Sequence, residues 1–239
     1  MLFTSFLTLS QATEKLAFRI IEALVAFYPY SSLAPYAPTI WQLLMTKLRD
    51  QRNPGYSRLF FHAFSIFIIH YGTTVMYDLL ESISAGVVAN LIQQVWAPQA
   101  ASIAAGDDIE IKETLIGGTK LLCESPISQS SEIFGHLLKA LVYLANARGV
   151  HNNVGVISIG DDVDERGLDT AYSKLAYCQL PDIDHDKNVH QASFYFVSSL
   201  SLLCQRNPGR YTSIISSALD SNESAVLAAA VKSAGLSII

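Results

Sequence analysis

The sequence contains few charged residues and no excess of basic ones. Charged side chains make up 15% of the 239 residues, and 16 Lys and Arg are outnumbered by 21 Asp and Glu, for a formal net charge of −5. Proteins dedicated to nucleic-acid binding usually carry a basic face, so we expect no nucleic acid among the partners. Half of the residues are hydrophobic, which excludes an intrinsically disordered chain and allows a sizeable core.

Cysteine is scarce as well. Cys123, Cys178 and Cys204 are odd in number, far apart, and each lies inside or beside an apolar stretch. This pattern predicts free thiols in a reducing compartment and not a disulfide framework. The first residues contain no basic region followed by a small-residue cleavage site, so we expect no secretory signal.

Signals for β-strands are nearly absent, and 154–160 (VGVISIG) is the one short candidate. Helical spacing dominates instead. The first segment has two adjacent apolar stripes, which predict a helix with a wide buried face that ends at Pro29. The stripes comprise Leu16, Ile20, Leu24 and Phe27, and beside them Phe18, Ile21, Val25 and Tyr28.

Apolar periodicity and turn signals predict a series of further helices. An Asn53-Pro54-Gly55 turn is expected to separate the second helix from the third, and Asp220 with Glu223 is expected to form a capping box. The expected helices cover about 33–49, 59–71, 76–96, 108–125, 131–144, 170–178, 188–205, 210–219 and 223–234.

Pairs of these helices start near residues 12, 55, 108 and 187, about 40 to 55 residues apart before the last interval widens. Helical hairpins at this spacing predict an all-α, HEAT-type solenoid, an armadillo-like α-α superhelix, with a compact bundle as the alternative. No domain boundary is visible, so we expect a single architectural unit over 1–239.

A stretch at about 148–168 breaks the helical pattern. It is rich in Gly, Asn and Asp, and it is too long for an ordinary connection between helices, so we interpret it as an acidic loop insertion. Loops often carry binding functions, and a cluster of carboxylates suits a basic partner surface. We therefore predict a partner-binding site at Asp161, Asp162, Asp164 and Glu165, joined by Asp169; a merely solvated loop is the alternative.

Residues 59–77 contain no Asp, Glu, Lys or Arg and are numerous enough to cross a bilayer. The stretch also carries histidines, hydroxyl side chains and a glycine, and no second such segment follows. We therefore expect a helix buried in a helical array and no membrane insertion. His62 and His70, both within it, are expected to lie in the core or to line a groove.

Two runs resemble ligand-binding loops but lack essential residues. DIDHDKNVH at 182–190 begins like an EF-hand, yet Lys187 stands where glycine is needed and Ser193 where a bidentate glutamate is needed. GGTK at 117–120 differs from a phosphate loop, in which the lysine precedes the hydroxyl residue, because here the threonine comes first and the surrounding sequence is helical. We therefore expect no metal and no nucleotide, and we interpret Gly117 and Gly118 as sites of close helix packing.

Motifs for covalent catalysis are also missing. The sequence has no GxSxG element, and Cys123 in LLCESP is typical of a small core residue. We therefore expect no enzymatic activity, no catalytic residues and no cofactor.

Four segments in series resemble the C-terminal part of the CAS family of nuclear exportins, which belong to the karyopherin-β superfamily. The resemblance runs from about Leu16 to the end of the chain. It is carried by YSRLFFHAFSIFIIHYGTTVMYDLLESI (56–83), IKETLIGGTKLLCESP (111–126), DERGLDTAYSKLAYC (164–178) and CQRNPGRYTSIISSAL (204–219).

The resemblance implies a HEAT-repeat fragment of a nuclear transport receptor. Members of the family bind importin-α together with Ran in its GTP form, return it from the nucleus to the cytoplasm, and shuttle through nuclear pores. They are roughly four times as long as this chain, as many stacked repeats require, and their Ran contacts lie largely in N-terminal repeats. A generic helical-repeat scaffold for other proteins remains the alternative function.

Overall fold

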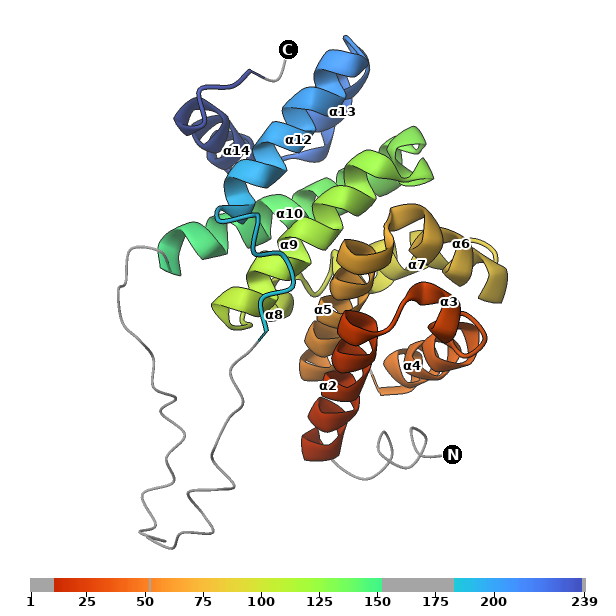
Figure 1. Ribbon diagram of the computed structural model, residues 1–239. Coiled ribbons are helices and arrows are strands. Elements are labelled where there is room, and N and C mark those ends of the chain that lie inside the picture. Colours follow the sequence, from red (N-terminus) through yellow and green to blue (C-terminus); the bar gives the residue numbers. More distant parts are fainter. Residues whose placement is uncertain (1–10, 52, 152–182, 238–239) are drawn as a thin grey trace, which may run out of the picture.

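The computed structural model describes residues 11–51, 53–151 and 183–237 (Figure 1). Within these ranges all regular structure is helical and no strand is present, as the periodicity predicts. The strand candidate at 154–160, the helix expected at 170–178 and Cys178 lie outside the described residues.

The helices follow one another with short connections wherever the chain is described (Figure 1). In chain order they are α2 (Gln11–Phe27), α3 (Tyr30–Leu33), α4 (Ala37–Gln51), α5 (Pro54–Tyr71), α6 (Thr73–Ile83), α7 (Val87–Leu91), the π-helical turn η1 (Ile92–Trp96), α8 (Ala100–Ile103), α9 (Asp108–Glu124), the 3-10 turn η2 (Pro126–Gln129), α10 (Ser131–His151), α12 (Ala192–Arg206), α13 (Arg210–Ala218) and α14 (Ser221–Ser233).

Two layers of helices are stacked in chain order. The first helix of each hairpin packs on the first helix of the next, which gives a layer of α2, α5, α9 and α12. In the second layer α4 packs on α6, and α10 packs on η1 and on α13. Stacking of successive hairpins is the architecture of a solenoid and not of a closed bundle, so the predicted fold is confirmed.

Local signals at the helix ends explain several boundaries. The capping box at α14 is confirmed: the Glu223 N–H donates to Asp220 Oδ1 at 2.8 Å, and the Asp220 N–H donates to Glu223 Oε2 at 3.0 Å. The interpretation of residues 53–55 as a turn ahead of a helix starting near 59 is wrong. Asn53 is the N-cap of α5 and Pro54 its first residue, a position where proline's missing N–H is not needed.

Gly117 and Gly118 lie where α9 crosses its neighbours closely, as expected. A Cβ atom on Gly117 would lie 2.6 Å from the Cα of Ser65 in α5, and one on Gly118 would lie 2.5 Å from Leu141 Cδ2 in α10. At Gly117 the approach is to the backbone of α5, which only glycine permits, whereas at Gly118 it is to a leucine side chain; α9 contacts its neighbours in both layers through this pair.

The wide buried face predicted for α2 is only half correct. Phe18, Ile21 and Val25 are buried against α5. The neighbouring stripe is uncovered, with Leu16 56%, Ile20 40% and Phe27 73% exposed. The reason is position, because α2 is the first described helix of its layer and has a layer neighbour on one side only.

The hydrophobic stretch at 59–77 is divided between α5 and α6 at Gly72, whose φ of 92° ends the first helix. Residues 60–68 of α5 are buried without interruption. Among the helices that the structure describes, none is both long and apolar enough to span a bilayer by itself. One pair, α6 with α7 and η1, reaches that length and composition together but is bent by 99°.

Candidate functional site

The predicted partner-binding residues Asp161, Asp162, Asp164 and Glu165 lie outside the described residues. The structure does describe the chain on both sides of these residues. Helix α10 continues to His151, past the point near 148 where the sequence pattern fails, and the chain is described again from Ile183. Residues 183–191, here called the return segment, run beside α9 and lead into α12 (Figure 1).

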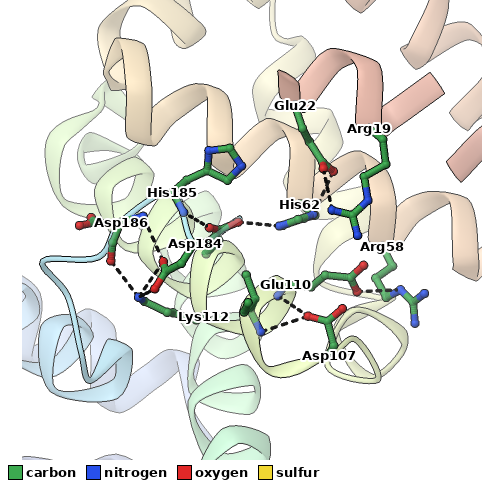
Figure 2. Close-up of polar contacts among 12 residues, drawn as sticks. Arg19, Glu22, Arg58, His62, Asp107, Glu110, Lys112, Asp184, His185 and Asp186 are labelled. Carbon is green, nitrogen blue, oxygen red and sulfur yellow. Dashed lines mark hydrogen bonds and ion pairs between the residues drawn. The ribbon is translucent and has the colours of Figure 1, made fainter. Parts of the chain in front are cut away.

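A buried lysine of α9 binds the return segment. Lys112 Nζ donates to both carboxylate oxygens of Asp184, at 2.9 and 2.7 Å, and to the carbonyl of Asp186 at 2.8 Å (Figure 2). Partial burial by itself raises the pKa of Asp184. The hydrogen bonds from Lys112 and from the Asp186 N–H outweigh this effect and lower the pKa below its usual value. Three oxygen atoms of the EF-hand-like run, from Asp184 and Asp186, therefore accept hydrogen bonds from an ammonium group of the protein.

Glu113, the next residue of α9, binds the return segment and α5 at the same time. Its carboxylate is fully buried, and Oε1 accepts the backbone N–H of His185 at 2.6 Å. Its other oxygen lies 2.7 Å from Nε2 of His62 in α5. One side chain therefore joins two helices of the layer to the return segment.

His62 continues this network to α2. Its Nδ1 lies 3.4 Å from Glu22 Oε1, an ion pair longer than an ordinary hydrogen bond, and Arg19 pairs with the same carboxylate at 3.4 Å (Figure 2). Burial by itself lowers the pKa of His62, but the hydrogen bonds and negative charges of Glu113 and Glu22 raise it to about 9. The imidazole is therefore charged at neutral pH, and two cations balance two carboxylates.

A further ion pair lies at the start of α9. Arg58 of α5 pairs through Nε with Glu110 at 3.3 Å, and its guanidinium also donates to the carbonyl of Ala105. Asp107 caps the helix by accepting the N–H groups of Ile109 and Glu110 at 3.1 and 2.9 Å. These contacts fix the start of α9 against α5.

The two histidines expected in the core or in a groove have different environments. His62 is buried, as expected. His70 lies at the surface, and its Nε2 is 2.9 Å from Nδ1 of His185 in the return segment. One of these two nitrogens donates and the other accepts, which adds a third contact between the return segment and the layer.

The described part of the chain offers little that could support covalent or metal chemistry. Burial, followed by the negative charge of Glu124, raises the pKa of Cys123 to about 12, so its thiol is protonated at neutral pH and a poor nucleophile. Burial also raises the pKa of Cys204. No group of three or more His, Cys, Asp or Glu in the described ranges is arranged to hold a metal ion.

Sequence reasoning did not identify Lys112, Glu113 or Glu22 as functional candidates. The available signal was weak: Lys112 and Glu113 lie in IKETLIGG, where the helical period leaves room for buried polar residues between apolar ones. His62 is 40 residues from Glu22 and 51 from Glu113 in the chain. Asp184 and His185 are each 72 residues from their partners in α9, so no local spacing reveals these contacts.

Comparisons with known proteins agree with this architecture. Residues 2–230 match the family described as CAS/CSE protein, C-terminus. Exportin-2 of Mus musculus is 22% identical over 96% of this chain, and Exportin-2 of Drosophila melanogaster is 24% identical over 87%. A solved structure of the exportin Cse1 in its cargo-free, cytoplasmic state covers 96% of this chain with a TM-score of 0.66 and 18% identity. The chain spans about a quarter of the length of these proteins.

Proposed function

We propose that this chain, which belongs to the CAS/CSE protein family, acts in a nuclear export receptor. That receptor returns importin-α from the nucleus to the cytoplasm together with Ran-GTP. The match of residues 2–230 to the C-terminal region of that family carries the proposal. Relatives named Exportin-2 and a two-layer helical solenoid support it. The chain would then shuttle between the nucleus and the cytoplasm and act by binding, without catalysis.

Within this function, we propose that the acidic insertion binds a basic surface of importin-α. Asp161, Asp162, Asp164 and Glu165 place four negative charges close together in sequence. Further along the chain, the return segment is held on α9 through Asp184 and His185. An acidic loop attracts a basic partner over about one Debye length, ~8 Å at physiological ionic strength.

A replacement experiment tests this function. The region of mouse Exportin-2 that this chain matches is exchanged for the chain, and the chimera is incubated with importin-α and with Ran loaded with GTP or GDP. We expect the chimera to retain importin-α with Ran-GTP and not with Ran-GDP. The control is mouse Exportin-2 from which the same region is deleted, which should retain less.

Two outcomes would contradict the proposal. Retention no better than that of the deletion variant would show that this chain does not supply the function of the replaced region. Binding of other proteins irrespective of the nucleotide would favour a generic helical-repeat scaffold.

A further inference from the structure

Of the contacts that hold the return segment, the one between two histidines differs in chemistry from the others. Lys112 binds Asp184 through an ion pair, and Glu113 accepts the backbone N–H of His185. The third contact joins two imidazole rings, with His70 Nε2 and His185 Nδ1 2.9 Å apart. Imidazole gains and loses its charge near neutral pH, so this contact can respond to a small change in pH.

The two rings are placed for a hydrogen bond between their nitrogens. Their planes are inclined by 79° and their centroids lie 5.1 Å apart, so the rings meet edge to face and do not stack. With no added proton, or with one, one nitrogen donates and the other accepts. With both rings protonated, each nitrogen carries a hydrogen and neither can accept. The hydrogen bond is then lost, and two positive charges face each other.

The surroundings of His70 also oppose its protonation. Partial burial, followed by the positive charge of His185, lowers the pKa of His70 below its usual value of 6.5. The negative charges of Glu113 in α9 and Asp186 in the return segment act in the opposite direction and do not outweigh them. Burial raises the pKa of Tyr71, the neighbouring aromatic residue of α5, so its hydroxyl is uncharged.

Nearby charged groups keep their charges when the pH falls from 7.5 to 5. The hydrogen bonds from Lys112 and the Asp186 N–H outweigh partial burial and hold the pKa of Asp184 below its usual value, so its carboxylate stays ionised. Glu113 and Glu22 outweigh burial and raise the pKa of His62 to about 9, so its imidazole stays charged. Acidification in this range therefore acts on the histidine pair and leaves the ion pair of Lys112 in place.

We propose that His70 and His185 form a proton-operated latch, which holds the return segment against α5 and opens when both imidazoles are protonated. Opening releases the side chain of His185 and loosens the residues after it, while Asp184 stays on α9. The return segment thus has a fixed point at Lys112 and a reversible one at His70. Because the folded state favours neutral His70, its contribution to stability is complete above pH 6.5 and is lost as the pH falls through its lowered pKa.

Amide hydrogen exchange of the whole chain between pH 7.5 and 5 tests the latch, with rates corrected for the pH dependence of free amides. We expect protection over 185–190 to fall about fivefold toward pH 5, the effect of losing one hydrogen bond. His70→Ala removes the latch, so protection there should be low and independent of pH. His190→Ala, at an exposed position of the same segment, is the matched control and should behave like the unmodified chain.

Titration of the His70 ring by NMR gives a second readout. The pKa of His70 should rise in His185→Ala, because the covering ring and its positive charge are both removed, and should not change in His190→Ala. Equal pH dependence of protection in the unmodified chain and in His70→Ala would overturn the proposal, as would an unchanged His70 titration in His185→Ala. Loss of protection throughout α5 and α9 over the same pH range would indicate general acid unfolding and would also overturn it.

Discussion

At the residue scale, His62 is held in its charged form by carboxylates from two other helices. Glu113 of α9 and Glu22 of α2 raise its pKa to about 9, against an unfolded value of 6.5. A raised folded-state pKa adds stability that is complete below pH 6.5 and is lost as the pH rises through about 9. We therefore expect the free energy of unfolding to decrease between pH 6.5 and 9 through this residue.

Urea unfolding of His62→Gln over this pH range tests the assignment. The variant leaves two buried carboxylates without their shared cation, so it should lose about 3 kcal/mol at pH 6.5 and show a flatter pH profile than the unmodified protein. His136→Gln, at an exposed position of α10, is the control and should retain the original profile. Parallel pH profiles for His62→Gln and the unmodified protein would show that His62 does not carry this charge.

Lys112 has a more local role, because its main partner is the return segment and not another helix. Lys112→Met keeps the bulk of the buried side chain and removes the three hydrogen bonds to Asp184 and Asp186. We expect faster amide hydrogen exchange over 184–187 with a global loss of only about 1 kcal/mol, since Asp184 is partly exposed and can be solvated.

The control for this variant is Lys139→Met on α10, which breaks an ion pair with Glu223 in which the lysine is half-exposed. It should leave exchange over 184–187 unchanged. Unaltered exchange in Lys112→Met would mean that other contacts, such as those of His185 with Glu113 and His70, hold the return segment without the lysine.

At the scale of the helices, the sequence predicts where helices form better than it predicts which of their apolar faces are covered by a neighbouring helix. The capping box of α14 and the close packing at Gly117 could be predicted because each depends on residues nearby in the chain or on a single small side chain. The exposed stripe of α2 could not, because an apolar stripe looks the same whether or not a neighbour lies against it. The start of α5 was misplaced because Asn-Pro-Gly is compatible with both a turn and a capped helix start.

The crossing of α5 and α9 gives a prediction at this scale. Gly117→Ala places a methyl group against the backbone of Ser65, which cannot move without shifting α5. Overpacking of this kind should cost about 1–3 kcal/mol, measured by thermal or urea unfolding. Gly55→Ala in the first turn of α5 meets only Asn53 Oδ1 at 3.5 Å and should be close to neutral. Equal stability of the two variants would show that α9 does not depend on this close approach.

At the scale of the whole molecule, the order of hairpins could be predicted and the polar network that joins them could not. Spacing along the chain reports hairpins, because each is local. Glu22, His62, Glu113 and the His185 N–H come from four separate segments, and only stacking brings them together. The acidic residues of the insertion remain a prediction, since they lie outside the described residues.

The last prediction concerns the electrostatic role of that insertion. Replacing Asp161, Asp162, Asp164 and Glu165 by Asn or Gln in the mouse Exportin-2 chimera should slow association with importin-α in the presence of Ran-GTP. Exposed charges contribute little to the free energy of the bound complex and more to the rate of encounter. We therefore expect association to be roughly two- to fivefold slower, with a smaller effect on the dissociation rate. The difference should disappear at high salt, where screening is stronger.

Stopped-flow measurements at two salt concentrations provide this comparison, and circular dichroism checks that the helical content is unchanged. The control removes the same amount of negative charge from four exposed acidic residues elsewhere, Asp50, Asp78, Glu124 and Glu132. If both variants associate equally slowly, net charge and not the insertion steers the encounter. If neither differs from the unmodified chimera at low salt, the insertion is a solvated connector. A rate that falls only for the insertion variant, and only at low salt, requires a local attraction between the insertion and a basic surface of importin-α.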